Sequence, residues 1–283
     1  MKRLSSLLLT LATVLATAFA ISAQERQIIP NVLNQGEVDS LVRDFTKNEE
    51  DFRYALNNYI FTRKATIHTV GLGGLITGTY RRDSFMTFTD AGERFERILY
   101  APISTLRELQ ITKEDLEDLG GVNPFAISPS KVSQYHFSYV GKQRIDDLNL
   151  HVFDVRPKKV PKKVSNRFFR GRIWVDDTDK MIVRSRGKGI PEGKQRFPVV
   201  DTWRTNVDGK YWFPAYSASD DELVFSNGLV VKIRMRVFYE DYKQGRSDVQ
   251  ILDDDTEIID PEKTEKKGDD KDPPPPPPPA RTN

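Results

Sequence analysis

Apolar and polar side chains alternate clearly along residues 167–186, and this stretch organises the rest of the sequence. Phe169, Ile173 and Val175 fall on one side of its first half, while arginines and a tryptophan fall on the other. A period of two indicates a strand with two different faces. The aspartate-rich residues 176–179 are typical of a turn that leads into a returning strand. Neither half is apolar throughout, so we expect a hairpin of an antiparallel sheet that is not buried on both faces.

Similar alternation predicts about ten strands, joined one after another by short turns. Asp208-Gly209 and Asn227-Gly228 are dipeptides that favour tight hairpins. Strands linked in this way form a meander rather than parallel units with crossover helices. The expected strands are residues 59–70, 75–89, 93–100, 135–141, 148–156, 167–175, a return from 181, 197–207, 211–219, 222–225 and a last strand from 231.

Helical periodicity is confined to two regions. In residues 37–58, Val38, Leu41 and Phe45 lie on one stripe, which predicts one bent helix or two short ones packed on the sheet. Residues 103–119 are expected to form a second helical insertion, in which the spacing of a threonine and an aspartate resembles a capping box. This insertion either covers an opening of the sheet or lies on the surface. The expected fold class is therefore mainly β with helical insertions (α+β).

Both ends of the chain are expected to lie outside the folded domain. Residues 1–23 have the pattern of a secretory signal, with a positive start, an apolar run and small residues that suit cleavage near Ala20 or Ala23. An uncleaved membrane anchor is the alternative, but the run is short for a span. We expect a periplasmic protein with a domain at residues 24–252 and a tail at residues 253–283.

Charge is unevenly distributed along the chain. Residues 253–272 hold ten acids against four lysines, a composition typical of disorder, and a polyproline segment follows as a spacer or as a ligand for a partner. Residues 156–172 hold eight basic residues and no acid. This basic stretch is either a solvated loop or a docking patch for a membrane surface or an envelope transport partner. The docking candidates are Lys158, Lys159, Lys162, Lys163 and Arg167.

No residue pattern indicates catalysis, a metal or a cofactor. The chain has no cysteine, which excludes disulfides and thiol chemistry. His68, His136 and His151 lie far apart in sequence and are expected to have surface or core roles. The glycines near residue 71 lack the spacing of a nucleotide-binding loop. We therefore expect a protein that is not an enzyme, and nucleic acid is not an expected partner of an exported protein.

Residues from about 40 to 243 resemble the bacterial outer-membrane lipoprotein-sorting family, part of the lipoprotein-localisation-factor superfamily. The resemblance is carried by YAPISTLRELQITKEDLEDL (100–119), YVGKQRIDDLNLHVFDVRPKK (139–159), FRGRIWVDDTDKMIVRSRGK (169–188), DGKYWFPAY (208–216) and VKIRMRVFYEDYK (231–243). It implies an unclosed antiparallel barrel whose helices form a lid over a hydrophobic cavity. It also implies periplasmic carriage of acylated lipoproteins or related lipids, without catalysis. The acidic, proline-rich tail departs from the family pattern. No arginine of this sequence is matched to one that latches the lid, so a gating mechanism is not carried over from the family.

The expected function is that of a monomeric periplasmic carrier, which binds acyl chains in a half-barrel for transport to the outer membrane. A hydrophobic cleft is sufficient for binding, because burial of an acyl chain contributes about 0.8 kcal/mol per methylene. The alternative is a non-catalytic envelope structural or adaptor protein with a filled core and a tethering tail. The cleft candidates are Phe169, Ile173, Val175, Val231, Ile233, Met235 and Val237 from the sheet, with Val38, Leu41 and Phe45 from the helix.

Overall fold

The computed structural model describes most of the chain between residues 27 and 245. The described residues are 27–56, 58–88, 94–112, 115, 127, 129–160, 162, 168–192 and 196–245. The predicted signal sequence and the tail at 253–283 lie outside them, as do Lys163 and Arg167 of the basic stretch.

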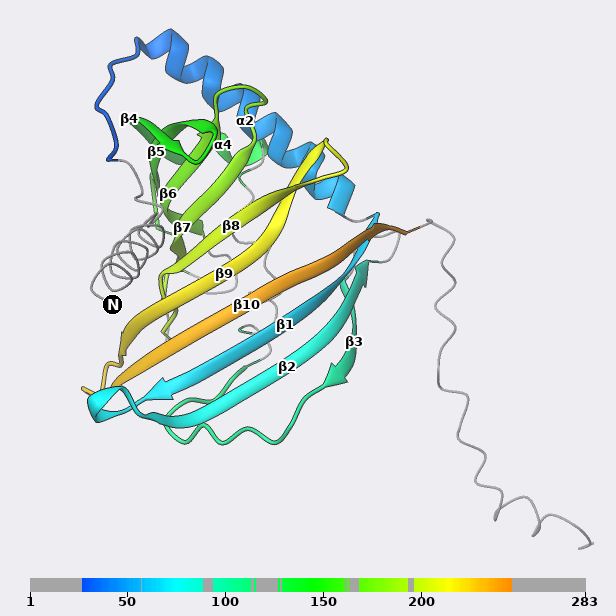
Figure 1. Cartoon of the computed structure of the whole chain (residues 1–283). Helices are drawn as coiled ribbons and strands as arrows, with labels where there is room; N and C mark the ends of the chain where they lie inside the picture. Colours follow the sequence, from blue (N-terminus) through cyan, green and yellow to red (C-terminus); the bar gives the residue numbers. More distant parts are fainter. Residues whose placement is uncertain are drawn as a thin grey trace, which may run out of the picture. The chain divides into compact units, whose positions relative to one another are not determined.

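The described domain is a single antiparallel sheet of ten strands that does not close (Figure 1). Its order is β3-β2-β1-β10-β9-β8-β7-β6-β5-β4, so the first and last strands of the sequence lie side by side and β3 and β4 form the two edges. The strands are β1 (Tyr59–Val70), β2 (Ile76–Phe88), β3 (Arg94–Tyr100), β4 (Tyr135–Ile145), β5 (Leu148–Pro157), β6 (Phe168–Asp176), β7 (Ile182–Ile190), β8 (Val200–Val207), β9 (Tyr211–Val224) and β10 (Val230–Gln244). This sheet confirms the predicted unclosed, mainly β fold.

Three helical elements accompany the sheet in the described ranges. They are α2 (Gln35–Leu56), the short α4 (Pro129–Val132) and the 3-10 turn η2 (Leu72–Gly74). The first is a single continuous helix, where the sequence left open a bent helix or two short ones. Asn34 caps it. Its side-chain Oδ1 accepts a hydrogen bond from the backbone amide of Glu37 at 3.0 Å, and its backbone amide donates to the Glu37 carboxylate at 2.8 Å. In this part of the chain, none of the helices combines the length and the apolar character that crossing a bilayer requires.

Two sequence predictions are wrong in detail. Residues 103–110 form no helix but an extended segment, tied to β2 by the Thr105 amide, which donates to the Thr79 carbonyl at 2.9 Å. Residues 211–224 form one long strand instead of two. The capping box at Thr112 and Asp115 is present, with the Asp115 amide 3.2 Å from the Thr112 hydroxyl, but the helix expected after it lies outside the described residues.

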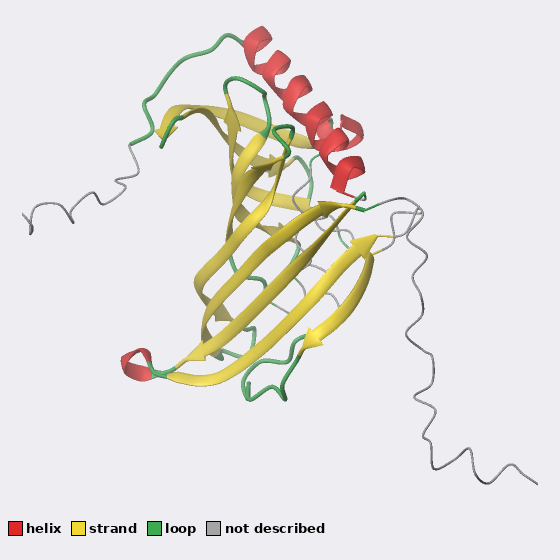
Figure 2. Ribbon diagram, turned by 45° about the vertical axis from the view of Figure 1, so that its right-hand side comes forward, coloured by secondary structure: helices red, strands yellow, loops and turns green. Residues whose placement is uncertain are grey.

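We call the side of the sheet that packs against α2 its inner face. Near the start of α2, Val38, Leu41 and Phe45 share a buried cluster with Phe169, Ile173 and Val175. Near its end, the buried apolar residues of α2 share a second cluster with β1, β9 and β10. The helix therefore fills the inner face in front of β5, β6 and β7 and reaches the far half of the curved sheet (Figure 2).

The outer face of the hairpin is partly buried as well. Trp174 is 5% exposed and packs with Leu150, Val152 and Val183, and Ile28 covers this cluster. An isolated bridge between Ile29 and Lys142 holds the covering segment against the edge strand β4. The expectation that this hairpin is buried on one face only is thus wrong, because a segment distant in sequence covers the second face.

A buried ion pair fixes α2 to the middle of the sheet. Glu49 is fully buried in α2, and its carboxylate accepts hydrogen bonds from Arg204 of β8 at 2.5 and 3.0 Å. The Arg204 guanidinium also lies over the Phe52 ring at 4.4 Å and donates to the Ile182 carbonyl at 3.1 Å. Helix and sheet are therefore joined by charge as well as by apolar packing.

Two glycines face each other across β6 and β7. Gly171 of β6 lies opposite Gly187 of β7, and the Phe169 ring lies against both. A Cβ added at Gly171 would lie 2.2 Å from the Arg186 carbonyl oxygen, and one at Gly187 would lie 2.5 Å from the Phe169 ring. The two glycines leave room for a fully buried aromatic ring that covers their backbone.

Candidate functional site

A cavity of about 300 Å³ opens on the inner face, beyond the part that α2 fills. Its wall is the apolar stripe of β10, where Ile233, Met235 and Val237 alternate with outward-facing charged side chains. The neighbouring strands add further apolar side chains. The apolar lining residues are Ile67, Leu109, Ile111, Phe197, Pro198, Val200, Leu223, Phe225, Ile233, Met235, Val237 and Tyr239.

An extended segment forms the other wall of the cavity. Leu109 packs on the cluster of Leu223, Val231 and Ile233, and Ile111 packs on the cluster that includes Met235. Gly78 lets this segment approach β2, because a Cβ there would lie 2.8 Å from the Thr105 carbonyl oxygen. The cavity is thus bounded on one side by a stiff sheet and on the other by chain without regular secondary structure.

The lining also includes eight polar or charged residues, of which Glu108 and Gln110 are exposed and the others have a polar or charged neighbour, such as Thr112 with Asp115. The Thr202 and Ser217 hydroxyls bond to each other at 2.8 Å. Lys188 bonds to Glu192 at 3.0 Å, and Arg196 lies 3.7 Å from the same carboxylate. Paired hydroxyls and rim charges leave the interior suited to apolar groups, because unpaired polar atoms are costly to bury.

The structure divides the predicted cleft residues into two groups. Ile233, Met235 and Val237 line the cavity, and Val231 is buried beside it without lining it. The candidates of the opening hairpin and of α2 pack against each other instead, so in the structure helix α2, and not a cavity, covers the hairpin. A role for this second group in ligand binding stays a prediction.

Several lining residues were missed in the sequence. Leu223 continues the alternation of β9, which the sequence prediction had split, and Ile67 lies on the inner stripe of β1. Leu109 and Ile111 carry no local signal, because they lie in a segment predicted to be helical. The basic stretch 156–172 contributes no lining residue; its described lysines, Lys158, Lys159 and Lys162, are exposed.

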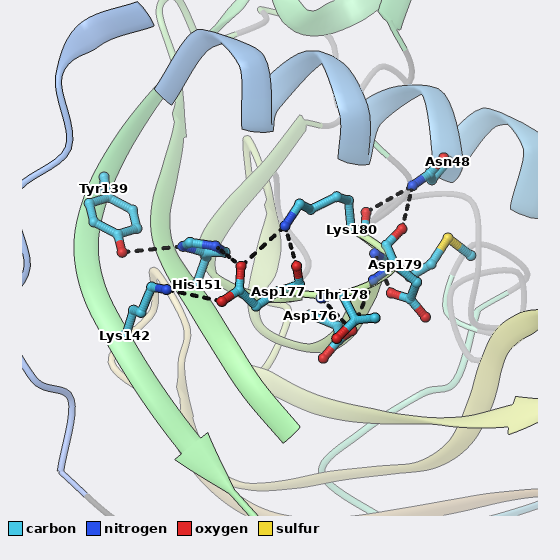
Figure 3. Close-up of polar contacts among 10 residues, drawn as sticks. Asn48, Tyr139, Lys142, His151, Asp176, Asp177, Thr178, Asp179 and Lys180 are labelled. Atoms are coloured by element: carbon cyan, nitrogen blue, oxygen red, sulfur yellow. Dashed lines mark hydrogen bonds and ion pairs between the residues drawn. The ribbon is translucent and has the colours of Figure 1, made fainter. Parts of the chain in front are cut away.

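The one buried histidine among the described residues belongs to a polar cluster away from the cavity (Figure 3). The His151 Nε2 lies 2.8 Å from the Asp177 carboxylate, and its Nδ1 lies 3.2 Å from the Tyr139 hydroxyl. Lys142 and Lys180 donate to the same carboxylate at 3.0 and 3.1 Å. The cluster ties β4 and β5 to the turn after β6, and every charged group in it has a partner.

The electrostatics of this cluster follow from burial and from the two lysines. Burial lowers the pKa of His151, and the nearby carboxylate only partly opposes this because it is shared with Lys142 and Lys180. Burial alone would raise the pKa of Asp177, but its three hydrogen-bond donors outweigh that effect and hold the pKa well below its usual range. The arrangement is a neutral imidazole beside a carboxylate with two ammonium partners, and no lining residue of the cavity takes part.

Two other histidines and a second charged cluster also lie outside the cavity lining. His68 bonds to the Thr79 hydroxyl at 3.0 Å on the outer face, and His136 is exposed. Glu96 of β3 accepts from Arg63 and Arg82, and these donors, with the Ser84 hydroxyl, outweigh burial and lower its pKa to about 2. Within the described ranges, no three His, Cys, Asp or Glu side chains are grouped so that they could hold a metal ion.

Comparisons with known proteins give structural similarity only. No family model and no curated protein matches the sequence. Among solved structures, the chain is similar to a LolA superfamily protein from Nitrosomonas europaea, with a TM-score of 0.32 and 12% identity over 69% of this chain and 93% of that one. It is also similar to a DUF1329 family protein from Desulfovibrio piger, with a TM-score of 0.37 and 12% identity over 74% and 96%. The structure of MucB matches with a TM-score of 0.27 and 13% identity over 73% and 94%. The function proposed below rests on the cavity and the surface of this structure.

Proposed function

We propose that this protein is a periplasmic carrier that binds acyl chains of lipoproteins or related lipids without catalysis. The observation that carries the proposal is the cavity on the inner face, whose sheet wall is formed by Ile233, Met235 and Val237. Pockets for small ligands have volumes from about 300 Å³ and mostly apolar linings. Ten methylenes buried there would contribute about 8 kcal/mol, so no polar constellation is needed for binding.

The hairpin tips at one end of the sheet support an encounter with a membrane. Leu72 and Leu75 in the β1–β2 tip are 95% and 72% exposed, and Val224 and Val230 in the β9–β10 tip are 57% and 53% exposed. Because β1 pairs with β10, the two tips lie side by side (Figure 1). Residues 71–79 and 225–231 contain no charge. Exposed aliphatic tips of this kind suit shallow insertion among lipid chains.

The apolar β9–β10 tip adjoins the cavity, because neighbouring residues of the same hairpin contribute to both. Leu223 and Phe225 line the cavity, and Val224 between them is exposed on the opposite side of β9. An acyl chain that leaves a membrane at the tips would therefore meet the cavity wall within the same hairpin. This arrangement supports transfer between a bilayer and the protein, with a membrane surface or an envelope transport protein as partner.

A second candidate function is that of a non-catalytic structural or adaptor protein of the envelope. The observation that favours it is the buried cluster under α2, where Phe45, Phe153 and Phe169 are fully buried and fill the inner face in front of β5 and β6. If the remaining cavity holds no ligand, the whole sheet would serve as a scaffold for the tail.

Uptake of a fluorescent fatty acyl probe distinguishes the two functions. We expect binding by the full chain, and native mass spectrometry of the purified protein should detect copurified lipid. Leu223→Trp fills the cavity and should abolish probe binding, whereas Glu222→Trp places the same side chain on the outer face of the same strand, outside the apolar tip, and should leave it intact. No probe uptake and no copurified lipid in the unaltered protein would refute the carrier and favour the scaffold.

A further inference from the structure

The outer face of β4–β7 carries a groove of about 900 Å³ that is strongly basic. Among the described residues that line it there are six cationic side chains and one carboxylate, Asp154. The cationic side chains are Arg156, Arg170, Arg172, Arg184, Arg186 and Lys188. This groove lies on the opposite side of the sheet from the cluster under α2.

Three of the six cations are neutralised by carboxylates. Arg172 forms two hydrogen bonds to Asp154 at 2.7 and 3.1 Å. Arg184 forms two to Asp201 at 2.8 and 2.6 Å. Lys188 bonds to Glu192 at 3.0 Å.

The remaining three arginines have no carboxylate partner within the described ranges. Arg156, Arg170 and Arg186 are exposed and take part in no ion pair there. Val155 pairs with Gly171, so Arg156 and Arg170 lie opposite each other on neighbouring strands, and Arg170 pairs with Lys188 on the next strand. Like charges placed directly opposite each other destabilise a sheet. The fold alone therefore gives no reason for this row of cations.

The other half of the same face provides an internal comparison. On β1, β9 and β10 the outward cations meet acids across the strands: Lys64 pairs with Glu240, Lys232 with Glu222, and Arg234 and Arg236 with Asp220. This half is an ordinary solvated face with balanced charge. The groove differs from it in keeping three arginines without an ion pair: Arg186 lies opposite Asp201 on β8, but that carboxylate is bonded to Arg184.

The floor of the groove is rigid. The Arg184 guanidinium lies between the rings of Trp174 and Trp203, at 4.4 and 4.0 Å from their centroids. The Trp174 Nε1 donates to the Gln143 side chain at 2.6 Å. A floor that is held on both sides keeps the neighbouring arginines in place for an incoming anion.

Groove and cavity meet at Lys188. This residue lines both, and Val199 of the groove lies between Pro198 and Val200 of the cavity. The two strands here, β7 and β8, pair over only four residues, Arg184–Gly187 with Val200–Trp203, so the end of β7 is not paired with β8. A molecule could thus contact the cavity with one end and the groove with the other.

We propose that the groove holds the phosphate monoester head group of a lipid whose acyl chain occupies the cavity. This inference rests on the proposed carrier function and names the class of its ligand. A phosphate monoester carries about −1.5 to −2 charge at neutral pH and three acceptor oxygens. Arginine forks match phosphate in paired hydrogen bonds. Three unpaired arginines on one groove match a single group that carries more than one negative charge. They match an acidic peptide less well, because its carboxylates would be spread along an extended chain.

Binding of two matched probes to the full chain tests this inference. Short-chain phosphatidic acid and the diacylglycerol with the same chains differ only in the phosphate, and glycerol phosphate carries the phosphate without chains. We expect phosphatidic acid to bind at least tenfold more tightly than either. The triple variant Arg156→Gln, Arg170→Gln, Arg186→Gln should lose that preference and keep diacylglycerol binding. The matched control Lys232→Gln, Arg234→Gln, Arg236→Gln removes the same charge from the balanced half of the face and should keep the preference.

The outcomes separate this inference from the carrier function. Equal binding of the two lipids, or a preference that survives the groove variant, would overturn the head-group site and leave the carrier intact. Glycerol phosphate that binds as tightly as phosphatidic acid would overturn the link to a lipid. Absence of binding by both lipids would overturn the carrier and this inference together. All three replaced arginines are exposed, so an unchanged or raised melting temperature of the groove variant confirms that it folds.

Discussion

The ion pair between Glu49 and Arg204 makes a quantitative prediction about how α2 is held. The substitution Glu49→Gln keeps the shape of the side chain and removes its charge. Arg204 is 5% exposed and would keep the Ile182 carbonyl, the Phe52 ring and the single amide oxygen of the new side chain as contacts, but no negative charge. A buried charge left without its partner costs about 3–5 kcal/mol.

Coulomb's law gives a similar magnitude for the lost attraction. Two unit charges about 4 Å apart attract by about 4 kcal/mol at an effective dielectric constant of 20. For a domain of this size, 1 kcal/mol shifts the melting temperature by about 2–4 °C. We therefore expect Glu49→Gln to lower the melting temperature by about 6–20 °C.

Urea denaturation of a double-mutant cycle is the measurement. The cycle uses Glu49→Leu and Arg204→Met: each alone should be strongly destabilising, and the double variant should recover most of the loss, because no charge then stays buried. Asp220→Asn is the control: it breaks the exposed pairs with Arg234 and Arg236, for which about 0–1 kcal/mol is expected. The reasoning fails if Glu49→Gln costs no more than Asp220→Asn, or if the losses in the cycle simply add.

Three further predictions concern packing, pH and membrane contact. Gly187→Ala should cost about 1–3 kcal/mol in thermal unfolding, because the new Cβ would lie 2.5 Å from both the fully buried Phe169 ring and the Arg170 carbonyl oxygen; unchanged stability would show that both neighbours give way freely. Burial lowers the pKa of His151, so the unfolded chain binds the proton first, and the contribution of the neutral ring is present above about pH 6.5 and is lost as the pH falls through the lowered pKa. His151→Gln should therefore flatten the pH dependence of the melting temperature between about pH 7.5 and 5, and equal slopes for both proteins would contradict this. Leu72→Ser should weaken binding to phospholipid vesicles in a sedimentation assay without changing stability, because this side chain is 95% exposed; loss of stability would instead indicate a packing role.

Sequence patterns recover the strands of this sheet because each strand keeps a period of two. The bounds of β1, Tyr59–Val70, agree with the prediction residue for residue, since its inner positions are buried and its turn is rich in glycine. The single long β9 was split in the prediction because Asp221 interrupts its apolar side and Asp220 precedes it on the other side. Both are held by neighbours: Arg236 bonds to Asp220, and the Val199 amide bonds to Asp221.

The location of the cavity could not be predicted from local pattern. The stripe with Phe169 and the stripe with Met235 are equally apolar in sequence, yet one packs under α2 and the other lines the cavity. The difference depends on where α2 lies, and α2 is fixed by a pair, Glu49 and Arg204, that is separated by 155 residues. The cavity-lining side chains of the extended segment could not be predicted from the sequence either, because Leu109 owes its burial to contacts with distant strands.

The short pairing of β7 with β8 gives the sheet a mechanical weak point. Four residue pairs join these strands, whereas every other neighbouring pair is joined by at least six. We call the junction between β7 and β8 the seam. Helix α2 packs against strands on both sides of the seam and so bridges it. Bending should therefore concentrate at the seam, and Val200 and Thr202 of β8 would move away from Lys188 and Gly189 of β7, which line the same cavity, when it opens. A sheet built in this way can change the width of its cavity by flexing along one line while its strands stay intact.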